Sequence, residues 1–231
     1  MAFDFLRKNR TEGILSHKPS DEERKLYSET VNLGTWPMNM LDGEWISLPI
    51  QWQVMSRADG ITVLISRYVL DCRPYNDLDK WLKEQFVPRA FTEEEQELLW
   101  GVEKARLPQT TFFSERCLQM NPGILHGEAG RYARERGVSV SFYLKTTPNP
   151  SSRHGAFSPC WWWLGDKSER GAMAMNPDRT KSCYEADMDD IGVRPCIILE
   201  DSVYDGMEKT PFIPGSVSKV IMRYNDTIPD E

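Results

Sequence analysis

Two β-type segments joined by a turn narrow the range of folds open to this chain. Residues 49–55 alternate apolar and polar side chains, as a half-buried strand does. Residues 61–66 are mostly apolar or β-branched, and Ala58-Asp59-Gly60 between the two segments is a typical turn sequence. The pattern predicts a β-hairpin with a buried face, so the fold is expected to contain an antiparallel sheet.

Two helices are predicted to follow the hairpin. Apolar residues that recur at helical spacing indicate the first helix, and they are Leu78, Trp81, Leu82 and Phe86. The second helix begins at a capping box formed by Thr92 and Glu95, in which each side chain satisfies the other residue's backbone amide. Its apolar face is expected to include Leu98, Leu99 and Val102.

The remaining segments complete a mixed order of elements. A further helix is predicted at 127–136, an exposed loop at 146–155, and strands at 110–113, 172–175 and 193–199. Helices therefore cluster in the middle of the chain and strands lie toward both ends. This order predicts an α+β fold rather than a series of βαβ units.

Charge and composition argue against several classes of protein. The formal net charge is −7, and the basic residues are scattered among acids rather than gathered in the stripe of a nucleic-acid binder. No run approaches the roughly 20 apolar residues that cross a bilayer, and the N-terminus lacks the apolar core of a secretory signal. We expect no nucleic-acid partner, no membrane association, and a cytoplasmic protein or a phage product made in the cytoplasm.

The cysteines and histidines form no pattern typical of a disulfide framework or a metal site. The cysteines are odd in number, which predicts reduced and mostly buried thiols; they are Cys72, Cys117, Cys160, Cys183 and Cys196. His17, His126 and His154 lack the spacing of metal ligands. No metal or cofactor is therefore predicted, while calcium stays an alternative at an acidic run made of Glu185, Asp187, Asp189 and Asp190.

The motifs of common catalytic sites are missing from the chain. There is no G-x-S-x-G elbow, no P-loop and no G-x-G-x-x-G fingerprint. No catalytic residue is predicted on this basis.

Several short phrases occur in a particular order along the chain. They are Gly34-Thr35-Trp36-Pro37, residues 49–55, residues 63–71, Pro74-Tyr75-Asn76, residues 78–86, residues 90–95, Phe112-Phe113-Ser114-Glu115, residues 132–137, Trp162-Trp163-Leu164, and Gly192-Val193-Arg194-Pro195-Cys196. Together they resemble a family of uncharacterised bacterial and phage domains that share phrases of the type W-W-L-R-S-P and G-V-R-P-A. These domains are C-type-lectin-like, and are similar at a distance to formylglycine-generating enzymes and to the variable proteins of diversity-generating retroelements.

The resemblance implies a fold and a division of the chain. It implies a C-type-lectin-like fold, with a twisted antiparallel sheet, flanking helices and long loops on one face. It covers about residues 32–200, which leaves residues 1–31 as an N-terminal helical extension and residues 201–231 as a C-terminal extension packed on the domain. The chain departs from the family phrases at Gly165-Asp166-Lys167, where Arg-Ser-Pro is expected, and at Asp79, where the family has Arg.

Structural roles are predicted for a set of large side chains. Trp161 and Trp163 would share one face of a strand and Trp162 the other, so at least one face is expected to be core. A guanidinium inside a loop-rich fold can hold several carbonyl groups at once. The residues assigned to the core on these grounds are Trp52, Trp81, Trp162, Trp163 and Arg194.

The leading functional hypothesis is a non-enzymatic module that binds an unknown protein or small-molecule ligand. Its recognition surface is expected in the loops between Phe157 and Asp190, and its candidate binding residues are Trp161, Asp166, Lys167, Arg170, Asn176, Asp178, Arg179 and Tyr184. One extension of this hypothesis is that the segment is diversified, as in retroelement variable proteins. The alternatives are a cysteine- or metal-dependent oxidoreductase, which requires Cys183 and Cys196 to meet in space, and a structural phage or accessory protein.

Overall fold

Two five-stranded sheets contain about half of the residues that the computed structural model describes, namely residues 29–41, 44–67, 69–109, 161–176, 180–189 and 191–211. The first sheet has the order β10-β1-β2-β3-β9 and is antiparallel throughout. Its strands are β1 (Glu29–Leu41), β2 (Glu44–Ala58), β3 (Ile61–Ser66), β9 (Cys196–Glu200) and β10 (Thr210–Pro211).

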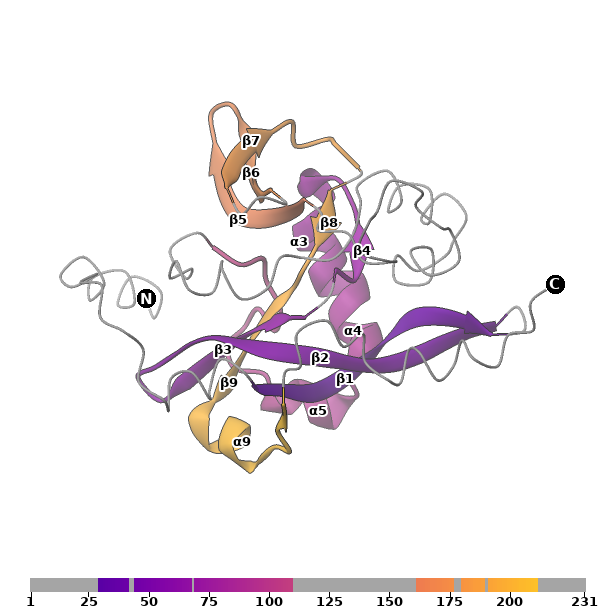
Figure 1. The fold of residues 1–231 in the computed structure, drawn as a ribbon, viewed down its shortest axis with the longest axis vertical. Coiled ribbons are helices and arrows are strands. Elements are labelled where there is room, and N and C mark those ends of the chain that lie inside the picture. Colours follow the sequence, from indigo (N-terminus) through magenta and orange to yellow (C-terminus); the bar gives the residue numbers. More distant parts are fainter. Residues whose placement is uncertain are drawn as a thin grey trace.

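The second sheet is smaller and has the order β4-β8-β5-β6-β7. Its only parallel pair among the described residues joins β5 to β8. Figure 1 shows β5, β6 and β7 at one end of the molecule and helix α9 (Asp201–Gly206) at the other. The strands of this sheet are β4 (Asp71–Cys72), β5 (Trp162–Ser168), β6 (Gly171–Met175), β7 (Lys181–Tyr184) and β8 (Gly192–Val193).

The predicted hairpin is present as β2 and β3. Asp59 and Gly60 both have positive φ angles, of 56° and 80°, which is the backbone geometry that a two-residue turn between twisted strands requires. The predicted alternation holds at the start of β2, where Leu48 and Ile50 are buried and Pro49 is exposed. Residues 52–56 are instead all buried, so both faces of the strand are covered there, and Trp52 is 0% exposed. The indole Nε1 of Trp52 donates a hydrogen bond to the carbonyl of Leu33 at 2.8 Å, which ties the hairpin to β1.

The first predicted helix contains a π-helical turn. It runs through α3 (Leu78–Trp81), η2 (Leu82–Phe86) and α4 (Val87–Ala90), after a short 3₁₀ turn η1 (Tyr75–Asp77). The wide turn ends two residues before Pro88, which has no N–H to donate and whose ring would crowd the carbonyl of an ordinary α-turn. All four residues of the predicted apolar stripe are at most 2% exposed.

The predicted capping box starts helix α5 (Glu93–Leu98) and also binds the first sheet. Thr92 Oγ1 accepts from the amide of Glu95, and Glu95 Oε2 accepts from the amide of Thr92. The other carboxylate oxygen of Glu95 accepts from the amide of Gly34 in β1 at 3.0 Å. Gly34 has φ +67°, and a Cβ there would lie 2.6 Å from the carbonyl oxygen of Ala90, so only glycine fits this contact.

The predicted apolar face of this second helix is wrong at Leu98 and at Val102. Helix α5 ends at Leu98, which is 40% exposed, and Val102 is fully exposed, while Leu99 is buried as expected. The chain leaves the helix because the following segment runs along the outer edge of β9. There Leu99 pairs with Leu199 and Arg106 pairs with Cys196.

The predicted strand at 193–199 is divided between the two sheets. Residues 192–193 form β8 of the second sheet and residues 196–200 form β9 of the first. A second part of the chain, at Ser66 and Leu70, runs beside them. The amide of Ser66 donates to the carbonyl of Pro195 and the amide of Leu70 donates to the carbonyl of Val193, both at 2.9 Å. Two adjacent segments therefore connect the sheets.

Arg194 lies at this crossing. Its side chain is only 2% exposed, its guanidinium lies 4.7 Å from the ring centre of Trp162, and its Nε donates to the carbonyl of Ser66 at 2.9 Å. Trp162 packs in a smaller apolar cluster with Met55, while Trp163 packs in the larger cluster. Both faces of β5 are thus buried at its start, in line with the alternation of the tryptophan run.

Further predicted elements lie outside the described residues. They are residues 1–28 of the N-terminal extension, the strand at 110–113, the helix at 127–136 and the loop at 146–155. Among the helices of the described chain, none has both the length and the apolar character needed to cross a membrane.

Replacement of Arg194 tests whether its contacts with Trp162 and Ser66 stabilise the part of the fold where the two sheets are connected. We expect Arg194→Ala to lower the free energy of unfolding by about 3 kcal/mol, because it leaves the Ser66 carbonyl without this donor and opens space beside Trp162. The matched control is Arg89→Ala, since Arg89 also lies over a tryptophan, Trp36 at 5.3 Å, but is exposed. The control should cost less than about 1 kcal/mol. Urea unfolding followed by tryptophan fluorescence measures both, and equal losses would contradict this role.

Candidate binding surface

Six of the eight predicted binding residues lie on strands β5, β6 and β7 or directly beside their ends. Lys167 and Arg170 are exposed, and Trp161 is half-buried against the larger apolar cluster. Asp178 and Arg179 lie outside the described residues. The remaining three are partly buried, and they are Asp166, Asn176 and Tyr184.

Lys167 and Tyr184 lie in one row across the three strands. Lys167 pairs with Ala172, and Ala172 pairs with Tyr184. Residues opposite each other in antiparallel strands project from the same face of a sheet. Ala172 between them is fully buried. The two larger side chains therefore flank a small residue on one face.

Asn176 links the ends of β6 and β7 through its side chain. Its Nδ2 donates to Thr180 Oγ1 at 2.7 Å and to Ser182 Oγ at 2.8 Å. Its Oδ1 accepts from the hydroxyl of Tyr184, also at 2.7 Å. Three hydrogen bonds thus hold Asn176 and Tyr184 in defined positions, and they bring together two of the residues predicted to bind.

A second polar contact joins this sheet to the turn at residues 75–77. The Nζ of Lys167 lies 5.6 Å from the centre of the Tyr75 ring and 3.4 Å from Asn76 Oδ1. The hydroxyl of Tyr75 donates to the carbonyl of Gly165 at 3.1 Å. Burial raises the pKa of Tyr75, and the nearby charges of Asp79 and Asp166 raise it further.

Sequence reasoning did not assign Tyr75 and Asn76 to the surface. The Pro-Tyr-Asn phrase marked these residues as a turn, but nothing local indicated that they would lie against β5. The contact joins positions 90 residues apart in the case of Tyr75 and Gly165.

An irregularity in β5 places Asp166 and Lys167. Trp163 pairs with Ala174 and Lys167 with Ala172, so three residues of β5 stand opposite a single residue of β6. The amide of Gly165 in this bulge donates instead to the carbonyl of Pro108 at 2.8 Å. Such bulges redirect side chains at the edge of a sheet. The bulge coincides with the Gly-Asp-Lys sequence that departs from the family phrase.

The cysteines of the described chain are free thiols in different surroundings. Cys183 is exposed, and its sulfur lies 3.2 Å from Ser168 Oγ. Cys196 is buried and donates to the sulfur of Met55 at 3.3 Å, on the other sheet. Cys72 is also buried. Across the described ranges no group of three or more His, Cys, Asp or Glu side chains is arranged to hold a metal ion.

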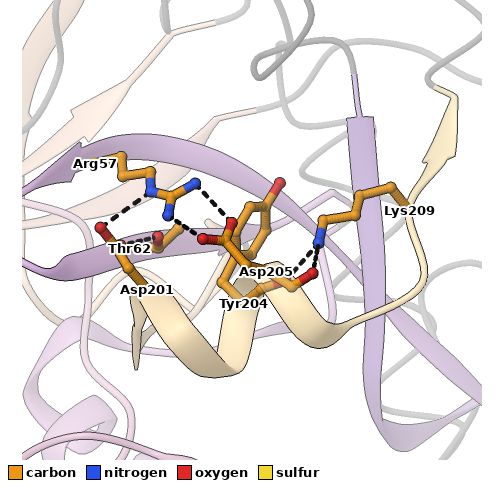
Figure 2. Close-up of polar contacts among 6 residues, drawn as sticks. All are labelled: Arg57, Thr62, Asp201, Tyr204, Asp205 and Lys209. Carbon is orange, nitrogen blue, oxygen red and sulfur yellow. Dashed lines mark hydrogen bonds and ion pairs between the residues drawn. The ribbon is translucent and has the colours of Figure 1, made fainter.

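A separate polar network surrounds helix α9 at the far end of the molecule (Figure 2). Arg57 makes two hydrogen bonds to Asp205, at 2.8 and 2.6 Å, and an ion pair with Asp201 at 3.1 Å. Thr62 donates to the other oxygen of Asp201 at 2.6 Å. These bonds lower the pKa of Asp205, since Arg57 favours its charged form. Each charge has an opposite partner, so the network is a structural clamp.

Tyr204 packs inside this clamp. Its side chain is 1% exposed, and its hydroxyl has no hydrogen-bond partner among the described residues. Arg57 and Lys209 both lie over its ring, at 5.6 and 4.7 Å. Burial, with a smaller effect of Glu29, raises the pKa of Tyr204 to about 12.

Comparison with known proteins gives no relative from which a function could be transferred. No family model, no curated protein and no solved structure matches the chain. The function must therefore be argued from the residues and their geometry.

Replacement of Asn176 tests whether its network fixes the surface. We expect Asn176→Ala to cost roughly 1–2 kcal/mol of unfolding free energy and to speed hydrogen exchange in residues 180–184, because three hydrogen bonds are lost. The matched control is Lys181→Ala, at an exposed position of the same strand. If both variants exchange at the wild-type rate, the network does not order the surface.

Replacement of Tyr204 tests the buried hydroxyl. Tyr204→Phe should leave stability unchanged or raise it at neutral pH, since no described hydrogen bond is lost. The folded protein retains the Tyr204 proton above pH 10, where the unfolded chain releases it, so wild-type stability should fall between pH 10 and about 12. The variant should lose less over this range. Urea midpoints across the range measure the difference, and identical pH profiles would contradict the assignment.

Proposed function

We propose that this chain is a C-type-lectin-like binding module for a protein or small-molecule ligand. The recognition surface consists of β5, β6 and β7 together with the turn at Tyr75 and Asn76. We call it the β5–β7 surface.

One observation carries this proposal: the polar side chains of the surface are held in place by hydrogen bonds and by the sheet beneath them. Asn176 fixes Tyr184, and Lys167 rests over Tyr75 beside Asn76. A surface whose side chains are already ordered loses less conformational entropy when a ligand binds. Such order supports recognition.

The chemical character of the surface favours a polar ligand. Asp166, Lys167 and Arg170 place both signs of charge along β5 and its turn, and Tyr184 adds an aromatic ring with a hydroxyl group. Charges of both signs suit a partner that offers donors and acceptors together. Aromatic and arginine side chains are the residues that most often anchor such contacts.

The arrangement of the sheets supports the C-type-lectin-like part of the proposal. The first sheet takes in both ends of the described chain, and β5, β6 and β7 of the second sheet stand at one end of the molecule, away from β1 (Figure 1). The β5–β7 surface therefore lies away from β1 and β10, which are the first and last strands of the described chain.

A ligand screen by NMR tests the proposal. The isotope-labelled protein is titrated with a library of sugars, amino acids, nucleosides and short peptides, and the amides whose shifts change are mapped. We expect ligands to shift residues 165–170 and 181–184. The double variant Lys167→Glu with Arg170→Glu should weaken their binding about tenfold or more, because it reverses both positive charges on the surface.

A matched double variant controls for net charge. Lys80→Glu with Lys83→Glu changes the net charge by the same amount at exposed positions of residues 78–90, which we call the helical segment. Ligands that shift the helical segment or α9 instead, or that bind both double variants equally weakly, would contradict the β5–β7 surface as the site.

A further inference from the structure

The chain enters and leaves the described body at neighbouring positions. Glu29, the first residue of β1, pairs with Pro211, the last residue of β10, and Thr30 pairs with Thr210. Among the described residues β10 makes these two register pairs, and Thr30 adds one side-chain hydrogen bond to the carbonyl of Thr210 at 3.3 Å. Helix α9 ends at Gly206, four residues before β10 begins, so the position of β10 is tied to that of α9.

Helix α9 is itself too short to be stable alone. It has six residues, and Glu200 at its N-cap forms no side-chain capping bond. Isolated helices shorter than about 12 residues are marginal in water. Within the helix Tyr204 is buried in the larger apolar cluster and Val203 packs against that cluster. The Tyr204 hydroxyl lacks a partner in the described chain, which offsets part of the gain from its burial.

Polar contacts stabilise helix α9, which is short and has no side-chain N-cap. Arg57 in β2 bridges Asp201 and Asp205, which lie one helical turn apart (Figure 2). Lys209 closes the other end of α9 by donating to the carbonyls of Tyr204 and Asp205, at 2.6 and 2.7 Å. These are charge-assisted bonds at partly exposed positions, since the side chain of Asp205 is 57% exposed. Dissolved ions weaken contacts of this kind.

We propose that α9 and β10 form an ion-paired latch that opens as a unit while the rest of the first sheet stays folded. In the closed state the latch holds the strand through which the chain leaves against the strand through which it enters. In the open state residues 201–211 separate from β1, and the outer edge of Glu29 and Thr30 becomes free. Opening responds to ionic strength, because Arg57 is the shared partner of both acids. This inference is independent of the proposed function.

The strand that precedes the latch provides the contrast. Residues 196–199 of β9 are all at most 2% exposed and pair with β3 along their length. Their other edge is covered at Leu99 and Arg106. Opening therefore stops at Glu200, where the buried strand ends.

Hydrogen exchange followed by mass spectrometry tests the latch in the full chain. In the wild type we expect residues 201–211 to exchange faster than residues 196–199, and 1 M sodium chloride to increase only the former rate. Arg57→Met, which keeps an unbranched apolar stem, should speed exchange of residues 201–211 about tenfold or more and remove the effect of salt. Asp205→Asn, at a more exposed position, should act in the same direction with a smaller effect. Arg89→Met, at an exposed site in the helical segment, is the matched control.

Two results would overturn the latch. If residues 201–211 exchange at the same rate as residues 196–199 and both change together in the variants, α9 belongs to one cooperative unit with the sheet. If Arg57→Met and Asp205→Asn leave the exchange of residues 201–211 unchanged, the ion pairs do not hold the helix.

Discussion

The contact between Arg194 and Trp162 is the interaction on which the arrangement of the two sheets depends. Arg194 sits where the chain passes from β8 to β9, and it joins the carbonyl of Ser66 to the face of Trp162. A buried guanidinium can do this because it combines a flat face for stacking with several directed donors. Trp162 in turn begins β5, so the guanidinium fixes the strand on which the β5–β7 surface is built.

The polar contacts at the two ends of the molecule serve different purposes. At α9 every charge of the network meets its opposite, and the contacts hold a short helix against the hairpin. On the β5–β7 surface the hydrogen bonds of Asn176 and the position of Lys167 order side chains that remain partly or fully exposed. Groups that are ordered and still accessible can recognise a ligand, which is why we place the function at this end.

Local patterns in the sequence were sufficient for several of the elements but not for their contacts. The capping box of Thr92 and Glu95 follows from a spacing of three residues, whereas the bond from Gly34 to Glu95 spans 61 residues and has no local signal. The burial of Arg194 could be expected from its chemistry, but not its position between two sheets. Val102 lies at helical spacing from Leu98 and Leu99, but helix α5 ends at Leu98 because the next segment pairs with the edge of β9.

The same limit applies to the candidate surface. Lys167, Asn176 and Tyr184 were chosen as polar or aromatic residues after a tryptophan run, and the structure places Asn176 and Tyr184 in direct contact. Tyr75 and Asn76 could not be added from the sequence, because their approach to β5 depends on how the helical segment packs against the second sheet. The bulge at Gly165 likewise depends on a distant carbonyl, that of Pro108.

Backbone ¹⁵N relaxation tests most directly whether the β5–β7 surface is ordered before any ligand binds. We expect order parameters near 0.85 for residues 162–168 and 181–184, as in a rigid backbone and as in strands β2 and β3. Values below about 0.6 across these residues, with rigid values in β2 and β3, would contradict it.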